Sequence, residues 1–265
     1  MGLGKEIWVE MEENDGTARW GARTWSEFAE ERARRQVAIV PVGAIEEHGP
    51  HLPLDTDNIM AEALASLVAA RTGAFLLPLV PYGQVWSLRA FAGSLTVPAE
   101  TLTRFACDLA LSLGEQGMRV VVFLSGHLGN MAALKEAARQ VMLTGGPYTV
   151  YLNYPDIRAI AAGITTSPVS HPAIIHSDEI ETSLMLAVAP DKVHMERAVR
   201  EYPEYPTTFE HDATGWETLS RSGVFGDARA ATREKGLALL TDLVDKMVAI
   251  VETANNAVGE RPQNT

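Results

Sequence analysis

Short apolar runs alternate with longer amphipathic segments along most of this chain, and that alternation limits the folds the chain can adopt. Such runs are typical of strands buried on both faces of a parallel sheet. They are rich in Val, Ile, Leu and Phe and lie at residues 37–44, 74–83, 118–126 and 148–154. Helical patterns lie at residues 56–73, 98–117, 130–146, 177–190 and 233–256. The alternation predicts an α/β fold with right-handed crossovers.

The length and composition are those of an ordinary globular protein. The chain has 265 residues, of which 46% are hydrophobic, enough for one well-formed core. We expect a single domain over residues 1–265, with an irregular N-terminal arm over about 1–24 and a frayed tail over about 256–265. Residues 200–222 are rich in Tyr, Pro, Thr and His, and are expected to form an irregular excursion.

Charge and local composition exclude several classes of protein. The formal net charge of −12 disfavours nucleic acid or an anionic membrane as a partner. The sequence contains no stretch of eighteen uninterrupted apolar residues, so it predicts no membrane-spanning helix. The first residues lack the apolar core of a secretory signal, so a cytoplasmic location is expected. Cys107 is the single cysteine and lies among apolar residues at helical spacing, which predicts a core position and no disulfide.

Candidate metal ligands follow two of the predicted strands. The sequence "GAIEEHGPHLPLDTD" comes directly after the first strand, and His127 follows the third strand between two glycines. Ligands bind beyond the carboxyl ends of strands in open α/β sheets, where these two segments meet. Mixed carboxylate and imidazole ligands suit zinc, manganese or iron. The alternatives are that His127 is an ordinary surface residue and that Asp57 or Thr56 caps the following helix.

Four motifs together resemble the creatininase (creatinine amidohydrolase) family over about residues 25–250. They are "VPVGAIEEHGPHLPLDTD", "SGHLGN", "HSDEIETS" and "GVFGDARAATREKG". The resemblance implies a three-layer α/β/α fold with a mainly parallel central sheet and a centre of two divalent metal ions, zinc and/or manganese, with iron possible. It implies Glu46, His48, Asp57 and His127 as ligands, with Asp57 bridging the ions. It also implies a homo-oligomer, a hexamer by family analogy.

The last ligand is less directly implied. Creatininase proper has a ligand Glu two residues after the histidine that His127 matches, but this chain has Gly129 there. Relatives with Gly at this place tend to carry a Glu in a "HAGExETS"-type segment, so the resemblance assigns Glu179 as the remaining ligand and as a catalytic residue. The alternative is that Glu179 and Glu181 are first-turn acids favoured by the helix dipole. Residues two apart face different sides of a helix, so only one of them is expected to reach the metals.

Neighbouring polar residues receive roles from the same resemblance. His176 matches the catalytic histidine, although an isolated histidine here would more often be a buried, hydrogen-bonded residue. Glu47 lies between two ligands and is interpreted as pointing outward. Asp178 is expected either to contact substrate or to cap the helix, and His51 to orient the first loop.

The predicted substrate pocket departs from the family pattern. Relatives commonly have "PYGxSxEHxxFPGT", whereas this chain has "PYGQVWSLRAFAGSL". Ser87 and Leu88 replace the acid and the histidine. We expect Trp86, Leu88 and Phe91 to line a more apolar pocket, with packing between subunits as the alternative role for Trp86.

The resemblance predicts an enzyme: a metal-dependent amidohydrolase that cleaves a non-peptide C–N bond of a small, creatinine-like cyclic amide with a metal-activated water. One alternative is a peptidase or amidase acting on a modified peptide, or a formamide deformylase. The alternative of another class is a non-catalytic metal-binding assembly protein. No serine-hydrolase G-x-S-x-G motif is present in the sequence.

Overall fold

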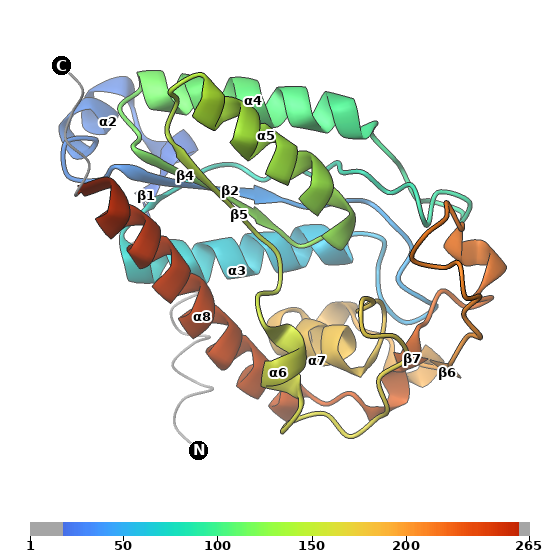
Figure 1. Ribbon diagram of the computed structural model, residues 1–265. Helices are drawn as coiled ribbons and strands as arrows, with labels where there is room; N and C mark the ends of the chain where they lie inside the picture. Colours follow the sequence, from blue (N-terminus) through green and yellow to red (C-terminus); the bar gives the residue numbers. More distant parts are fainter. Residues whose placement is uncertain (1–17, 260–265) are drawn as a thin grey trace.

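The core of the molecule is a sheet of five parallel strands in the order β1-β3-β2-β4-β5 (Figure 1). The computed structural model describes residues 18–259. The strands are β1 (Ala18–Arg19), β2 (Val37–Val42), β3 (Phe75–Leu76), β4 (Val120–Ser125) and β5 (Tyr148–Leu152). The predicted parallel sheet is confirmed, with the second apolar run forming only a short strand, β3.

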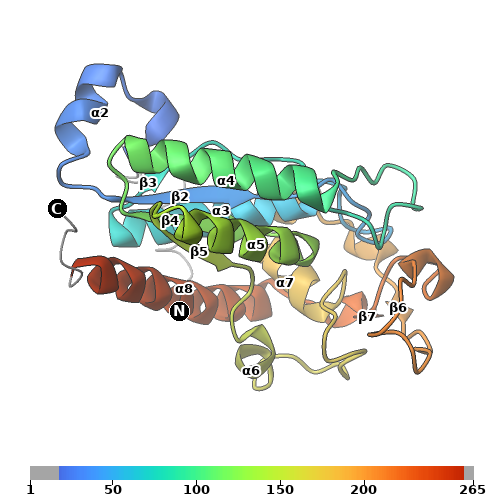
Figure 2. The same ribbon diagram turned by 45° about the horizontal axis from the view of Figure 1, so that its top comes forward.

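Helices cover both faces of this sheet, which confirms the three-layer α/β/α arrangement (Figures 1 and 2). The helices α4 (Ala99–Glu115) and α5 (Met131–Leu143) lie on one face. The helices α3 (Thr56–Thr72) and α8 (Arg233–Gly259) lie on the other. The predicted helix ending at Gly73 does end there, because Gly73 adopts a left-handed conformation with φ of 68°.

Alternation of side chains along the central strands explains the two cores. In β2, Val37 and Ile39 pack in the core that includes α3 and α8, whereas Ala38 and Val40 pack in the core that includes α4 and α5. Successive residues of a strand point to opposite faces, so an uninterrupted apolar run fills both cores. Each fully buried Val or Ile contributes about 1.5–3 kcal/mol relative to exposure.

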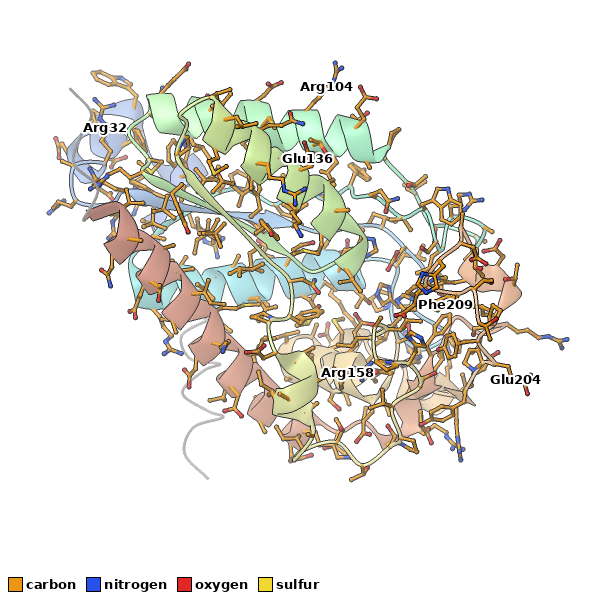
Figure 3. The ribbon with its side chains drawn as sticks, in the orientation of Figure 1. Arg32, Arg104, Glu136, Arg158, Glu204 and Phe209 are labelled. Atoms are coloured by element: carbon orange, nitrogen blue, oxygen red, sulfur yellow. The ribbon has the colours of Figure 1, made fainter. Side chains whose placement is uncertain are left out.

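The carboxyl ends of the strands meet a less regular region. It contains α6 (Ile157–Ala161), α7 (Glu179–Val188) and the antiparallel pair β6 (Arg200–Glu201) and β7 (Gly226–Asp227). The expected excursion is largely irregular: within residues 202–222 the regular element is the 3-10 turn Trp216–Thr218. Phe209 of the excursion lies at the end of the molecule where β6 and β7 are, and Arg104 lies on the outer helical layer (Figure 3).

The N-terminal part is more ordered than expected. The arm assigned to residues 1–24 contributes β1, and it leads to α2 (Trp25–Glu31), whose N-cap Thr24 forms a capping box with Glu27. Helix α8 continues to Gly259, beyond the expected start of fraying; the predictions for residues 1–17 and 260–265 lie outside the described residues. Further 3-10 turns are Trp20–Ala22, Leu128–Asn130, Pro190–Lys192, Met195–Arg197 and Ala228–Ala230. No helix in residues 18–259 is long and apolar enough to cross a membrane.

Candidate metal centre

Three segments bring carboxylates and imidazoles together at the carboxyl end of the sheet. Glu46 and His48 lie in the loop after β2, Asp57 lies in the first turn of α3, and His127 follows β4. All four side chains are buried. Strands β2 and β4 pair in parallel with Val42 opposite Ser125, so the two loops leave the sheet side by side. The structure thus places these four predicted residues in one cluster.

Asp57 occupies the middle of this cluster. Its Oδ1 lies 3.4 Å from Nε2 of His48, and its Oδ2 lies 3.1 Å from Nδ1 of His127. Two sets of potential ligand atoms share it: Glu46, Asp57 and His127 form one set, and His48, Asp57 and Glu181 form the other. Within each set the ligand atoms lie within 4.8 Å of one another. A carboxylate with one oxygen toward each set has the placement of a bridge between two ions.

Hydrogen bonds fix how the two imidazoles face the cluster. Nε2 of His127 lies 2.8 Å from the carbonyl oxygen of Gln84, and Nδ1 of His48 lies 3.1 Å from the carbonyl oxygen of Glu46. A carbonyl oxygen can only accept, so these ring nitrogens carry the protons and donate. When the ring is neutral, the other nitrogen of each histidine presents a lone pair to Asp57. This is the orientation that metal-bound histidines adopt.

Several buried atoms in the cluster have no hydrogen-bond partner within residues 18–259. They are Oε2 of Glu46, Nε2 of His48 and Oδ2 of Asp57. A buried polar atom left unpaired costs about 1–3 kcal/mol. Nδ1 of His127 also faces Oδ2 of Asp57 at 3.1 Å, so this contact needs a positive charge, supplied either by a proton on the ring or by a metal ion. Divalent cations that take mixed nitrogen and oxygen ligands fit this set.

The electrostatics of the cluster agree with a cation site. Burial lowers the pKa of His48, but the charges of Glu181 and Asp57 outweigh it and hold the pKa well above the ordinary value. Burial also lowers the pKa of His127, and Glu46 and Asp57 raise it further than burial lowers it. The carboxylates therefore create a field that strongly favours positive charge between them, whether protons or metal ions supply it.

The structure corrects the assignment of Glu179. Its side chain points away from the cluster, where the carboxylate accepts hydrogen bonds from the backbone N–H groups of Thr166 and Ser167 and from Nζ of Lys235 at 2.5 Å. Glu181 points into the cluster instead, with Oε2 3.6 Å from Nε2 of His48. Successive helical residues are rotated by about 100°, so residues two apart face nearly opposite sides. The expectation that one of the two acids reaches the cluster holds, but it is Glu181.

Gly129 shows why an acid cannot take its place in this chain. A Cβ atom at residue 129 would collide with the His127 ring and with the Gln84 carbonyl oxygen. Any side chain there would break the hydrogen bond that orients His127. In this structure the carboxylate that completes the cluster is that of Glu181, which reaches it from α7.

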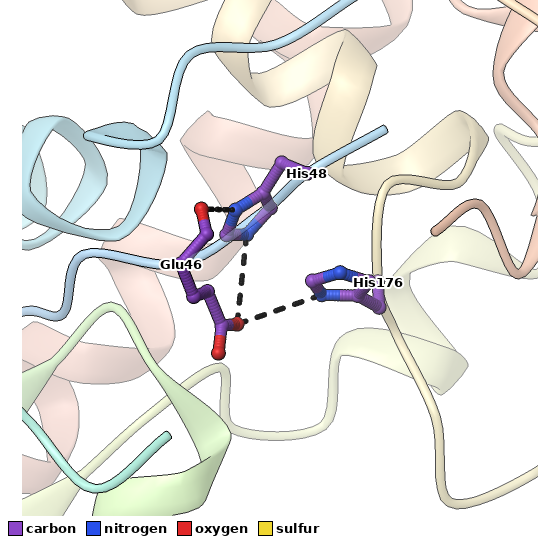
Figure 4. A group of neighbouring side chains, drawn as sticks. All are labelled: Glu46, His48 and His176. Atoms are coloured by element: carbon purple, nitrogen blue, oxygen red, sulfur yellow. Dashed lines mark hydrogen bonds and ion pairs between the residues drawn. The ribbon is translucent and has the colours of Figure 1, made fainter. Parts of the chain in front are cut away.

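His176 lies beside Glu46 and His48 of the cluster (Figure 4), and the carboxylate of Glu47 holds its ring from the other side. Its Nδ1 is 3.6 Å from Oε1 of Glu46, and its Nε2 is 3.0 Å from Oε1 of Glu47. Glu47 is buried and its other oxygen accepts a hydrogen bond from the backbone N–H of Gly49. The interpretation that Glu47 points outward was wrong. Burial and the neighbouring His48 lower the pKa of His176, whereas Glu47 and Glu46 outweigh them and raise it.

His51 joins the first loop to α7. Its Nε2 lies 2.8 Å from the hydroxyl of Thr182, and burial lowers the pKa of the ring to about 4. The ring is therefore neutral at physiological pH and acts as a polar tie between two segments that carry ligand candidates. This contact agrees with the expected role of orienting the loop.

A cavity of about 360 Å³ opens above the cluster, and it includes only one of the expected substrate-binding residues. Leu88 lines it together with Glu46, Asp57, His127, His176 and Glu181. Trp86 lies outside the lining, with the Arg89 guanidinium 4.1 Å from its ring centroid. Phe91 packs beside Leu88 behind the cavity wall, and Asp178 caps α7 by accepting from the N–H groups of Ile180 and Glu181.

Trp216 lines the cavity and escaped the sequence-based assignment. It lies in the irregular excursion, more than a hundred residues from Leu88, and no motif marks it. Its backbone N–H donates to the carbonyl oxygen of Ser87, which brings the excursion onto the loop after β3. Only tertiary contacts of this kind could have identified it.

Comparison with known proteins decides the family. The sequence model described as "Creatininase: Creatinine amidohydrolase" matches residues 22–251. The chain belongs to the creatininase family. It is 31% identical over 222 residues to a mycofactocin precursor peptide peptidase from Mycobacterium ulcerans, covering 80% of this chain and 82% of that protein. It is 29% identical over 246 residues to a creatinine amidohydrolase from Pseudomonas putida, covering 83% and 90%.

Solved structures support membership of the creatininase family. A manganese form of creatininase is 29% identical, covers 89% of this chain and 98% of that one, and superposes with a TM-score of 0.78. A zinc–zinc form of a creatininase mutant superposes with a TM-score of 0.76 at 29% identity and the same coverage. The chain is therefore a creatininase-family hydrolase that acts on carbon–nitrogen bonds.

Proposed function

We propose that this protein is a metal-dependent amidohydrolase that cleaves the C–N bond of a small cyclic amide or a related compound. The observation that carries the proposal is the pair of buried ligand sets that share Asp57 and open into a cavity of about 360 Å³. A cavity of this size is at the lower end of the range for small-molecule sites. The family membership supports the reaction class and leaves the substrate to be inferred from the cavity.

The proposed ligands are the two sets defined above. Glu46 and His127 would hold one divalent ion, His48 and Glu181 would hold the other, and Asp57 would contact both. The donor set suits zinc or manganese, and relatives of known structure occur in manganese and zinc–zinc forms. When bound, a pair of such ions lowers the pKa of water and polarises a carbonyl group.

His176 is the proposed proton donor of the site. The Glu47 carboxylate accepts from Nε2–H of His176, which turns Nδ1 toward Glu46 and the cavity. From that position Nδ1 in its protonated form can donate to the leaving nitrogen or to the oxygen that gains negative charge. Glu47 therefore acts through His176, by holding the ring in one orientation.

A second candidate function is hydrolysis of an amide in a modified peptide. The identity of 31% with the mycofactocin precursor peptide peptidase favours it, as does the apolar lining of the cavity. The two candidates share the same proposed metal ligands and proton donor. Hydrolysis of cyclic amides but not of short peptides would favour the first, and the opposite result the second. A non-catalytic role is disfavoured by the burial of His176 and Glu47 beside the ligand sets. Burying these polar side chains costs free energy, and a protein that only binds metal would not need them there.

Removal of metal is the test of this proposal. Treatment with a strong chelator is expected to lower turnover of cyclic amides, formamides or short peptides by at least about a hundredfold, since metal-ion catalysis is worth several kcal/mol. Zinc or manganese should restore it. Metal content and turnover are measured on the same samples, and circular dichroism verifies that the stripped protein is folded. Full turnover by protein without metal would contradict the proposal.

A further inference from the structure

Apolar side chains on four different segments of the chain line the cavity. Leu88 comes from the loop after β3, Ile157 from α6, Ile175 from the segment before α7, and Trp216 from the excursion. We call these four residues the apolar wall. They lie in the same cavity as the proposed metal ligands and His176.

Trp216 is held in place beside the reacting groups. Its ring centroid lies 5.8 Å from that of His176 in an edge-to-face arrangement and 5.0 Å from that of Phe225. The backbone N–H of Trp216 donates to the carbonyl oxygen of Ser87 at 2.9 Å. The ring of Phe209, a residue of the same excursion (Figure 3), also lies near the indole, with 6.4 Å between the ring centroids of Phe209 and Trp216. The indole is therefore a fixed surface next to the His176 ring, which we propose donates the proton.

The cavity offers a charged substrate group little recognition away from the metal ligands. Among the described lining residues, the one Lys or Arg is Arg158. Its guanidinium donates to the backbone carbonyl oxygens of His171 and Ile174 and lies 3.7 Å from a carboxylate oxygen of Asp178. Its Nε is buried and has no hydrogen-bond partner among the described residues. The Nη atoms of Arg158, however, are engaged with the segment that carries Ile175 and His176 and with Asp178.

We propose that the substrate carries an uncharged apolar group, branched aliphatic or aromatic, next to the scissile amide, and that Trp216 determines this preference. This inference rests on the proposed function, because it places the amide at the metal ligands and the apolar group on the apolar wall. Each buried methylene contributes about a fourfold gain in affinity. An aromatic wall adds contact area without requiring the wall to become ordered on binding.

Hydroxamic acids test the preference without knowledge of the substrate, because they bind metal ions through a constant head group. Dissociation constants are measured by calorimetry on the zinc-loaded protein for acetohydroxamate, 4-methylpentanohydroxamate and 3-phenylpropionohydroxamate. We expect the two apolar probes to bind at least about tenfold more tightly than acetohydroxamate. Trp216→Ala is expected to remove most of that ratio while changing the affinity for acetohydroxamate by less than about twofold.

Matched variants make the outcome specific. Trp25→Ala removes a tryptophan that is 85% exposed on α2, and it should leave the ratio unchanged. If Trp216→Ala does not fold, Ile175→Ala, a smaller change in the same wall, should lower the ratio. Equal affinity of the unaltered protein for all three probes would overturn the inference, and so would loss of the ratio in Trp86→Ala but not in Trp216→Ala. Failure to bind zinc would instead contradict the proposed function, and the inference with it.

Discussion

Glu181→Gln is expected to weaken binding of one of the two metal ions by more than about a hundredfold, because loss of even an outer contact to a metal ligand costs about 10–100-fold. The geometric reason is that Glu181 is the carboxylate of α7 whose oxygen lies beside Nε2 of His48, at 3.6 Å. An amide in its place offers a weaker neutral oxygen and removes a negative charge from a buried cation site. Metal per chain after dialysis, measured by mass spectrometry, should fall from two ions toward one, and turnover should fall with it.

Glu179→Gln is the matched control for this prediction, since the same change is made two residues away on the same helix. Glu179 pairs with Lys235 and accepts hydrogen bonds from the backbone N–H groups of Thr166 and Ser167. The change to Gln removes the negative charge of residue 179 and leaves the largely buried Lys235 ammonium without its anion. We expect the free energy of unfolding of the metal-free protein to fall by about 3 kcal/mol. Metal content should stay at two ions per chain. Loss of metal from Glu179→Gln but not from Glu181→Gln would show that the corrected assignment is wrong.

His176→Ala is expected to lower turnover by about 10²–10⁴-fold, the usual contribution of a positioned acid or base. Both metal ions should remain, because His176, which forms a third set of potential ligand atoms with Glu46 and His48, belongs to neither of the two sets that share Asp57. Turnover at saturating substrate and metal per chain are measured on the same preparation.

Two other histidines provide the comparison for His176. His127→Ala removes a residue of the ligand sets, and is expected to lower both metal content and turnover. His194 is about half exposed and lies outside those sets, so His194→Ala should change neither. Equal loss of metal from His176→Ala and His127→Ala would contradict the role of His176 as a proton donor.

The sequence predicted the parts of this structure that depend on local pattern. The apolar runs predicted the buried parallel strands, and "GAIEEHGPHLPLDTD" predicted that Glu46, His48 and Asp57 gather where β2 ends. His127 joins them because parallel pairing of β2 and β4 follows from the same alternation. The capping box of Thr24 and Glu27 was also visible in the sequence, and could have predicted α2.

The features that the sequence could not predict depend on how a helix is rotated about its axis and on contacts between residues that are far apart in the chain. Choosing between Glu179 and Glu181 requires the rotation of α7 about its axis, which is set by packing against the rest of the fold. Glu47 turns inward because His176, more than a hundred residues away, supplies its partner. Trp216 replaces Trp86 as the cavity tryptophan for the same reason, since the excursion reaches the loop after β3 only in the folded chain.

The central claim is that Asp57 bridges two metal ions between Glu46 and His127 on one side and His48 and Glu181 on the other. Anomalous diffraction from crystals of the manganese-loaded protein tests it most directly. We predict two anomalous peaks per chain about 3.5–4 Å apart, with one carboxylate oxygen of Asp57 toward each. A single peak, or a peak bound by Glu179 in place of Glu181, would contradict the claim.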